Sequence, residues 1–269
     1  MKYFKLTFAY LKKNWPIAII SLALGAVLST VRLGGGFFAY LGEYFSTNDK
    51  TFFDVYARIS PIIGSWWGTL LVVLASAAFF AYVAGVIDRH MKIGQLRLDA
   101  PLRKVNENFF FMLLFLVVFV LIEEVVNILI ALTSASFASF ASPVVAYLMT
   151  IVAFVLFQGI AIVFFVMGAL WVPECVITGM APKQALSTAL AMGKGHIGKI
   201  FLGAMMGVLP AFGISMLSAF VDPVTRTVLN AVAVALVVAY VPAFAFTAYY
   251  EISDLEREDL NPVKNVWNR

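Results

Sequence analysis

Only 13% of the 269 residues are charged and 62% are hydrophobic, whereas soluble domains carry roughly 25% charged residues. The mean hydropathy is +0.93, and no water-soluble fold of this size has a core large enough to bury so much apolar surface. These values exclude a soluble enzyme, a disordered chain and a nucleic-acid-binding domain. The single cysteine, Cys175, excludes an intrachain disulfide.

Long uncharged runs predict six membrane-spanning helices, because each span needs about 20 mostly apolar residues. The expected spans are residues 15–32, 61–87, 109–133, 143–173, 199–220 and 227–250. The Ser- and Thr-rich stretch that begins at residue 133 predicts the turn between the third and fourth spans. We therefore expect an all-α polytopic integral membrane protein, with one transmembrane domain over residues 1–250 and a polar tail over residues 251–269.

The first span has a Lys-rich start and a short apolar run, as a signal peptide does. No small-residue cleavage site follows it and five more spans do, so we expect it to be a retained helix.

The basic residues predict the orientation of the chain. Six spans place both termini on one side of the membrane, and 15 of the 19 Lys and Arg residues lie on that side. Because cytoplasmic loops carry an excess of Lys and Arg, we expect a cell-membrane protein with both termini in the cytoplasm. This arrangement accounts for the basic pI of about 9.1 with the lipid bilayer as the anionic partner and no nucleic acid.

The three cytoplasmic segments share a pattern of a short amphipathic stretch, a small polar residue and the start of a span. The small polar residues are Asn14, Asn108 and Gly195. The pattern favours three helical-hairpin repeats with amphipathic cytoplasmic helices, related about an axis along the membrane normal. In the first of these helices, Phe4, Phe8 and Leu11 share one face. The alternative is that basic linkers and spans alternate in any polytopic protein.

Two adjacent glutamates, Glu123 and Glu124, are the only charges deep within the expected spans. Glu123 lies 14 residues beyond Phe109, which is about 21 Å along a helix and toward the outer leaflet of a ~30 Å hydrocarbon core. Intramembrane carboxylates rarely face lipid, and Asn127 extends the polar patch by one helical turn. The functional interpretation is a ligand-binding or proton-relay site that faces a cavity.

The structural interpretation of the glutamates is an ion pair with a cation on the outer side, or hydrogen-bonded carboxyl groups between helices. The arginines on that side are Arg32, Arg58 and Arg226. We include them, with Glu123, Glu124 and Asn127, in the candidate ligand-binding site.

The remaining motifs give weaker expectations. The spacings Gly64/Gly68 and Gly203/Gly207 favour close helix packing within the chain, with dimerisation as the alternative. The aromatic outer loop, residues 33–60, indicates a re-entrant or interface-lying element that caps a cavity or anchors the chain.

The sequence contains no catalytic constellation. His90 and His196 fall in cytoplasmic linkers, where we expect solvated side chains, and two distant histidines and one cysteine give no metal-ligand spacing. No Ser or Cys has a positioned base. We therefore expect a protein that is not an enzyme, with no catalytic residues, metal site or cofactor.

The run ALWVPECVITGMAPKQALSTALAMGKGHIGKIFLGAMMG, residues 169–207, resembles a family of six-span prokaryotic membrane proteins. That family includes the membrane domain of some bacterial glycerophosphodiester phosphodiesterases. The matching positions are Ala185-Leu186, Lys194-Gly195 and the closing Tyr249-Tyr250-Glu251, whereas Ala189 and Leu190 stand where the family often has Ser and Trp. The resemblance implies the six-span fold and an association with glycerophospholipids. The phosphodiesterase domain has no counterpart in this chain, so its chemistry is not implied.

Two functions fit these features. The first is a non-catalytic binding or transport module for a lipid or another amphipathic small molecule, and the second is a membrane scaffold or accessory subunit of a larger complex. The expected partners besides the bilayer are a bound lipid and either a second copy of the chain or another protein. A cavity lined by Glu123 or Glu124 favours the first function, and a densely packed bundle favours the second.

Overall fold

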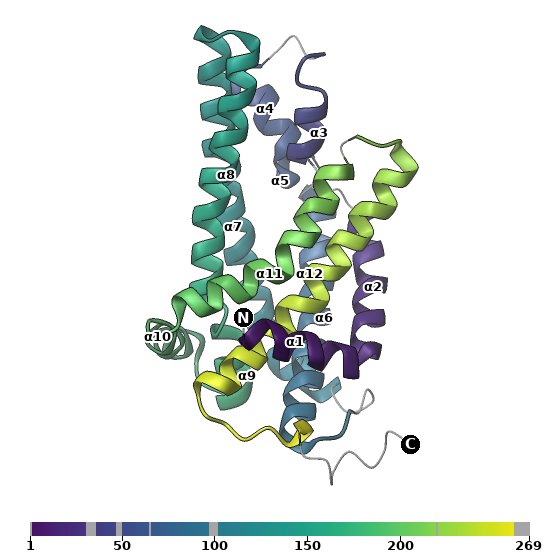
Figure 1. Cartoon of the computed structure of the whole chain (residues 1–269), viewed down its shortest axis with the longest axis vertical. Coiled ribbons are helices and arrows are strands. Elements are labelled where there is room, and N and C mark those ends of the chain that lie inside the picture. The colour runs from purple at the N-terminus through teal and green to yellow at the C-terminus, as the bar shows by residue number, and fades with distance from the viewer. Residues whose placement is uncertain are drawn as a thin grey trace.

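The computed structural model describes residues 2–30, 36–46, 50–64, 66–96, 102–218 and 220–260, and all regular structure in these ranges is helical. Long helices run along the molecule and short helices lie at its two ends (Figure 1). The stretches long and apolar enough to cross a membrane are Trp66–Ile93, Val105–Phe140, Pro143–Thr178, Ile197–Ser218 and Val224–Ile252. The expectation of an all-α, multi-pass membrane protein is confirmed at this level.

The first expected span, residues 15–32, corresponds to helix α2 (Trp15–Thr30), which has 16 residues. A helix of this length extends about 24 Å, less than the ~30 Å of a hydrocarbon core. Residues 31–35, which follow α2 and include Arg32, lie outside the described residues. Helix α2 packs along α12 (Pro223–Ile252), so it belongs to the bundle, but within the described residues five spans rather than six are long enough to cross a membrane.

Helices α7 (Leu102–Phe140) and α8 (Pro143–Gly168) form the longest hairpin (Figure 1). The predicted end of the third span at residue 133 is wrong, because α7 continues to Phe140, and only the last residues of the Ser- and Thr-rich stretch, at Ser142 and Pro143, mark the turn. The Thr133 hydroxyl donates to the Leu129 carbonyl at 2.7 Å, and such bonds to the preceding turn let hydroxyl residues remain in a helix. The turn lies after α7, and Pro143 begins α8, where its missing N–H leaves no carbonyl unpaired.

The three proposed repeats differ at their first helix. Helices α1 (Lys2–Lys13) and α10 (Pro182–Gly193) are separate from the spans that follow them, α2 and α11 (Ile197–Ser218). In the middle copy the amphipathic stretch is the first part of α7, with no break at Asn108. Residues 102–140 contain neither Gly nor Pro, so nothing interrupts the helix there.

Helix α1 packs against the bundle through one face. Its buried residues are Tyr3, Thr7 and Tyr10, which follow one another at helical spacing, and this face packs on α11 and α12. Phe8 is instead 60% exposed. The tyrosine-rich face therefore holds α1 against the bundle, and Phe8 points away from it beside the exposed lysines.

Helices α6 (Trp66–Ile93) and α12 are the central helices. In their most apolar windows 56% and 50% of the residues are buried, compared with 22–24% in the other three spanning stretches. Large apolar side chains on α7, α8 and α11, such as Phe110, Leu156 and Leu209, are exposed. Such a surface is expected where helices contact lipid tails rather than water.

Two glycines let α11 and α12 pack closely. A Cβ atom added at Gly203 would collide with the Phe244 ring, and one at Gly207 would collide with the Tyr240 ring. The Tyr240 hydroxyl donates to the Gly203 carbonyl at 2.6 Å. The Gly203/Gly207 spacing therefore serves packing within the chain.

The other glycine spacing is not contained in one helix. Gly64 ends α5 (Pro61–Gly64), whereas Gly68 lies in α6.

Gly207→Ala tests this contact, because the new methyl group must displace a Tyr240 ring that its own hydroxyl holds in place. We expect a loss of about 1–3 kcal/mol in the free energy of unfolding, measured as a lower melting temperature of the purified protein in detergent. The matched control is Gly213→Ala on the same helix, where the added Cβ meets no atom within 4 Å. Equal melting temperatures for the two variants would contradict the packing role.

Candidate functional site

The outer loop folds into short helices that pack against the long hairpin. These are α3 (Gly36–Gly42), α4 (Phe52–Ile59) and α5, and they lie near the end where α7 and α8 join (Figure 1). The Phe37 ring stacks on Phe154 of α8 at 3.8 Å between centroids, and Phe38 contacts Phe212 of α11 at 5.5 Å. Aromatic contacts thus hold α3 against both α8 and α11.

Glu124 is the polar contact between this loop and the spans. Its side chain, on α7, is buried, with 6% of the residue exposed. The Tyr56 hydroxyl donates to Glu124 Oε2 at 2.8 Å, and the Ser60 hydroxyl lies 3.0 Å from both carboxylate oxygens. Both donors come from α4 and the residue that follows it, where the Ser60 N–H caps the helix by bonding to the Tyr56 carbonyl at 2.8 Å. One helix end therefore presents two hydroxyl donors to one carboxylate.

Glu123 bonds to a different neighbour. Adjacent residues of a helix point about 100° apart, and the half-buried Glu123 side chain accepts a hydrogen bond from Gln158 Nε2 of α8 at 2.9 Å. Asn127 is buried one helical turn beyond the glutamates. The two carboxylates therefore join α7 to α4 on one side and to α8 on the other.

Arg58 and Arg226, two arginines of the candidate site, have partners other than these glutamates. Arg58 forms an ion pair with Glu43 at 3.1 Å. Arg226 Nε donates to the Ser218 carbonyl at 3.1 Å and so braces the connection between α11 and α12. Arg32 lies outside the described residues. The structure thus brings Glu123, Glu124 and Asn127 together on α7, without Arg58 or Arg226.

This arrangement suits hydrogen bonding between helices better than ligand capture. Burial, followed by the hydrogen bond to Glu124, raises the pKa of the Tyr56 hydroxyl above 10.0, so Tyr56 remains a proton donor at neutral pH. The hydroxyl groups of Tyr56 and Ser60 donate to the two oxygens of Glu124, the atoms that a cation would coordinate or to which a headgroup would donate.

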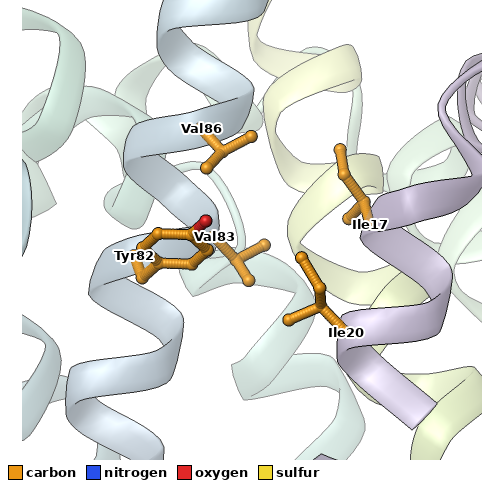
Figure 2. A pocket seen from close by; sticks show the side chains of 5 residues that line it. All are labelled: Ile17, Ile20, Tyr82, Val83 and Val86. Atoms are coloured by element: carbon orange, nitrogen blue, oxygen red, sulfur yellow. The ribbon is translucent and has the colours of Figure 1, made fainter. Parts of the chain in front are cut away.

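A narrow crevice lies elsewhere in the molecule, between α2 and α6. Figure 2 shows its lining side chains, which are Ile17 and Ile20 of α2 and Tyr82, Val83 and Val86 of α6. These side chains lie so close together that the crevice has no room for a water molecule. The glutamates do not line it, so it is not the carboxylate-lined cavity that the sequence suggested.

The opposite end of the molecule holds a polar cluster that sequence reasoning missed. His90, expected to be solvated, is only 2% exposed, and its Nδ1 shares a hydrogen bond with the Tyr10 hydroxyl at 3.2 Å. On the same turn of α6, the buried Asp88 pairs with Lys92 at 2.8 Å. The apolar character of α1 could have indicated a covered surface, but not that it covers His90.

The chain after α12 completes this cluster. The short 3₁₀ helix η1 (Glu258–Leu260) packs against α6. The buried Arg257 pairs with Asp259 through two hydrogen bonds of 2.8 and 3.1 Å, a bidentate geometry that stabilises a desolvated ion pair. Lys13 Nζ donates to the Asp259 carbonyl at 3.0 Å. The two ends of the described chain are therefore joined.

Among the described residues, no three His, Cys, Asp or Glu side chains come together in a way that could hold a metal ion. Cys175, expected at the end of the fourth span, is buried in α9 (Trp171–Thr178). Comparison with family models, with curated proteins and with solved structures finds no match to this chain. The resemblance to the phosphodiesterase-associated family therefore rests on its motifs alone.

Tyr56→Phe tests the hydrogen bonds around Glu124. Removing the hydroxyl deprives a buried carboxylate of a donor, and we expect a loss of about 1–2 kcal/mol in the free energy of unfolding. The measurement is denaturant or thermal unfolding of the purified protein in detergent. In a Glu124→Gln background the same change should cost less, because the charged acceptor is gone.

The control is Tyr147→Phe. Tyr147 lies on α8 against Tyr44 and Phe45, and in the described part of the chain no residue bonds to its hydroxyl. If Tyr56→Phe and Tyr147→Phe change the free energy of unfolding equally, the hydrogen bond of the Tyr56 hydroxyl contributes nothing to stability.

Proposed function

We propose that the chain is a cell-membrane protein with six spans and both termini in the cytoplasm, in which α2 is the short first span. The support is the position of the chain ends. Lys2 pairs with Glu251 at 2.5 Å, and Lys13 bonds to the segment after α12, so both ends meet at one end of the bundle. Helices α3 and α4 lie toward the opposite end of the bundle (Figure 1). Helix α2 leads from the end where the termini lie toward the end where α3 and α4 lie. The threefold hairpin repeat is part of this proposal, with its middle surface helix continuous with α7.

We further propose that the protein is a non-catalytic membrane scaffold or accessory subunit of a larger complex. The observation that carries this proposal is the bonding of the two intramembrane carboxylates. Glu124 accepts from Tyr56 and Ser60, and Glu123 accepts from Gln158. Because these bonds hold helices together, the polar patch has a structural use that needs no ligand.

The docking surface in this proposal includes α10. Its Ala185, Ala189 and Gly193 face the bundle, and the opposite face is polar and exposed, with Lys183, Gln184, Ser187 and Lys194. Exposed polar side chains at the end of a bundle are available to a protein partner or to a second copy of the chain. The binding or transport module for a lipid or amphipathic molecule is the competing function, and the resemblance to the glycerophospholipid-associated family favours it.

The topology is tested with single cysteines in a Cys175→Ala background. Lys5→Cys on α1, Ser187→Cys on α10 and Ser46→Cys near α3 are all at exposed positions. A membrane-impermeant maleimide applied to intact cells should label only the cysteine at position 46, and all three after the cells are permeabilised. Labelling of position 5 together with position 46 would show that α2 does not cross the membrane.

The scaffold proposal predicts that Glu123 and Glu124 affect stability but not ligand response. We expect Glu123→Gln and Glu124→Gln to lower the melting temperature. Any rise in melting temperature caused by added Na⁺, Mg²⁺ or phospholipid should stay as large as in the unchanged protein. The measurement is thermal unfolding of the full chain in detergent with and without each addition. A shift that either substitution abolishes would establish the glutamates as a binding site and favour the transport module.

A further inference from the structure

Helix α1 lies across the long helices rather than along them (Figure 1). Asn14 ends α1, because its side-chain amide and its backbone N–H both donate to the Tyr10 carbonyl at 2.9 Å. The chain then begins α2 at Trp15. Since the long helices are the ones that can cross a membrane, a separate helix lying across them runs along the membrane surface.

The contacts of α1 distinguish its two flanks. The Phe4 ring lies 6.2 Å from the Tyr240 ring of α12, measured between centroids. Lys2, on the opposite flank, pairs with Glu251, which lies 11 residues, or about 16 Å, further along α12. Lys13, on the same flank as Lys2, bonds to the segment after α12. The flank of Phe4 therefore faces the middle of the bundle, and the flank of the two lysines faces its end.

The flank that faces the middle of the bundle is aromatic and only partly covered by protein. The Phe8 ring stacks on Phe4 at 6.2 Å between centroids, and Phe8 is 60% exposed. Trp15, which begins α2, is 61% exposed, and tryptophan is enriched at the interface between membrane and water. An amphipathic helix in that interface places its apolar side at the boundary between headgroups and lipid tails. The exposed rings therefore suit contact with lipid.

The outward face of α1 carries two lysines that the protein does not neutralise. Lys5 and Lys12 are exposed, and their spacing of seven residues places both on one face, two turns apart. In the part of the chain that the structure describes, neither side chain has an ion pair or a hydrogen bond. Helix α1 itself contains no acidic residue. Its outward face is therefore complementary in charge to anionic headgroups.

We propose that α1 is a docking surface for anionic phospholipid, in which Phe8 and Trp15 contact the lipid tails while Lys5 and Lys12 bind headgroup phosphates. The tails are on the side of the bundle's middle, and the lysines lie at the level where phosphate groups meet water, as the two flanks require. This surface is separate from Glu123 and Glu124, and the proposal holds for the scaffold and for the binding module alike.

The first test measures lipid preference. The full chain, stripped of lipid in detergent, is titrated with phosphatidylglycerol or phosphatidylcholine, and thermal unfolding gives an apparent affinity for each. We expect phosphatidylglycerol to bind more tightly and to raise the melting temperature. Inorganic phosphate at the same concentration should give no shift, because it has no tails to contact the aromatic flank. A shift from phosphate as large as that from phosphatidylglycerol would overturn the proposal of lipid docking.

A pair of double variants locates the cations. Lys5→Gln with Lys12→Gln should reduce the preference for phosphatidylglycerol over phosphatidylcholine roughly 25-fold, because each basic residue near an anionic surface contributes about five-fold. The melting temperature without lipid should not change, since neither side chain has a partner in the described protein. Lys183→Gln with Lys194→Gln removes two exposed lysines of the α10 region and should leave most of the preference. Equal losses in the two double variants would show that only net charge matters, and the proposal would fail.

Single cysteines at adjacent positions identify the flank that contacts lipid. In a Cys175→Ala background, Phe8→Cys and Ala9→Cys place a bimane label at two exposed positions that point about 100° apart. In nanodiscs of phosphatidylcholine and phosphatidylglycerol, a nitroxide on the lipid tail should quench the label at position 8, and iodide in the water should quench the label at position 9. If iodide quenches both labels equally, the aromatic flank lies in water or against a protein partner, and the proposal is wrong.

Discussion

In a bilayer, polar groups that leave water must find their partners within the protein, and the buried Glu124 carboxylate meets this constraint with hydrogen bonds from another helix. A carboxylate at this depth is costly unless it is paired or hydrogen-bonded. Tyr56 and Ser60, which precede Glu124 in the chain by 68 and 64 residues, supply the donors from α4 and from the residue that follows it. The position of α4 against α7 is therefore tied to the burial of one side chain, and the aromatic contacts of α3 with α8 and α11 depend on the same docking.

The other end of the molecule meets the same constraint with ion pairs. Asp88, Arg257 and Asp259 are buried among α1, α6 and the segment after α12. Each charged group there has a partner that is close in the chain, Lys92 for Asp88 and Arg257 for Asp259. Local pairs of this kind form as soon as the chain turns, whereas the Tyr10–His90 contact requires α1 to dock. The cluster therefore contains ion pairs between residues that are close in the chain and one hydrogen bond between distant helices.

The sequence predicted the helices better than their ends or their contacts. Hydropathy located the spans because apolar runs of sufficient length admit few other structures in a bilayer, and Pro143 marked a helix start correctly. The end of α7 was missed because Ser and Thr are read as turn residues, although in a helix they can bond to the preceding turn. Glu123 and Glu124 stood out as unusual, but their partners Gln158, Tyr56 and Ser60 could not be predicted, since nothing in the local pattern specifies which distant segment packs there. His90 was misjudged for the same reason.

Helix α7 has 39 residues, a length of about 58 Å. A tilt of 40°, the upper end of the usual range, still leaves about 45 Å along the membrane normal, compared with a hydrocarbon core of about 30 Å. A hydrocarbon core of this thickness therefore cannot cover the whole of α7, whose first part is the amphipathic surface stretch. A buried hydroxyl network joins Tyr40 of α3 to Ser134 of α7 and Thr150 of α8 in this hairpin. With 39 residues against 16, α7 is far longer than α2, so the bundle is taller on the side of the α7–α8 hairpin than on the side of α2 (Figure 1).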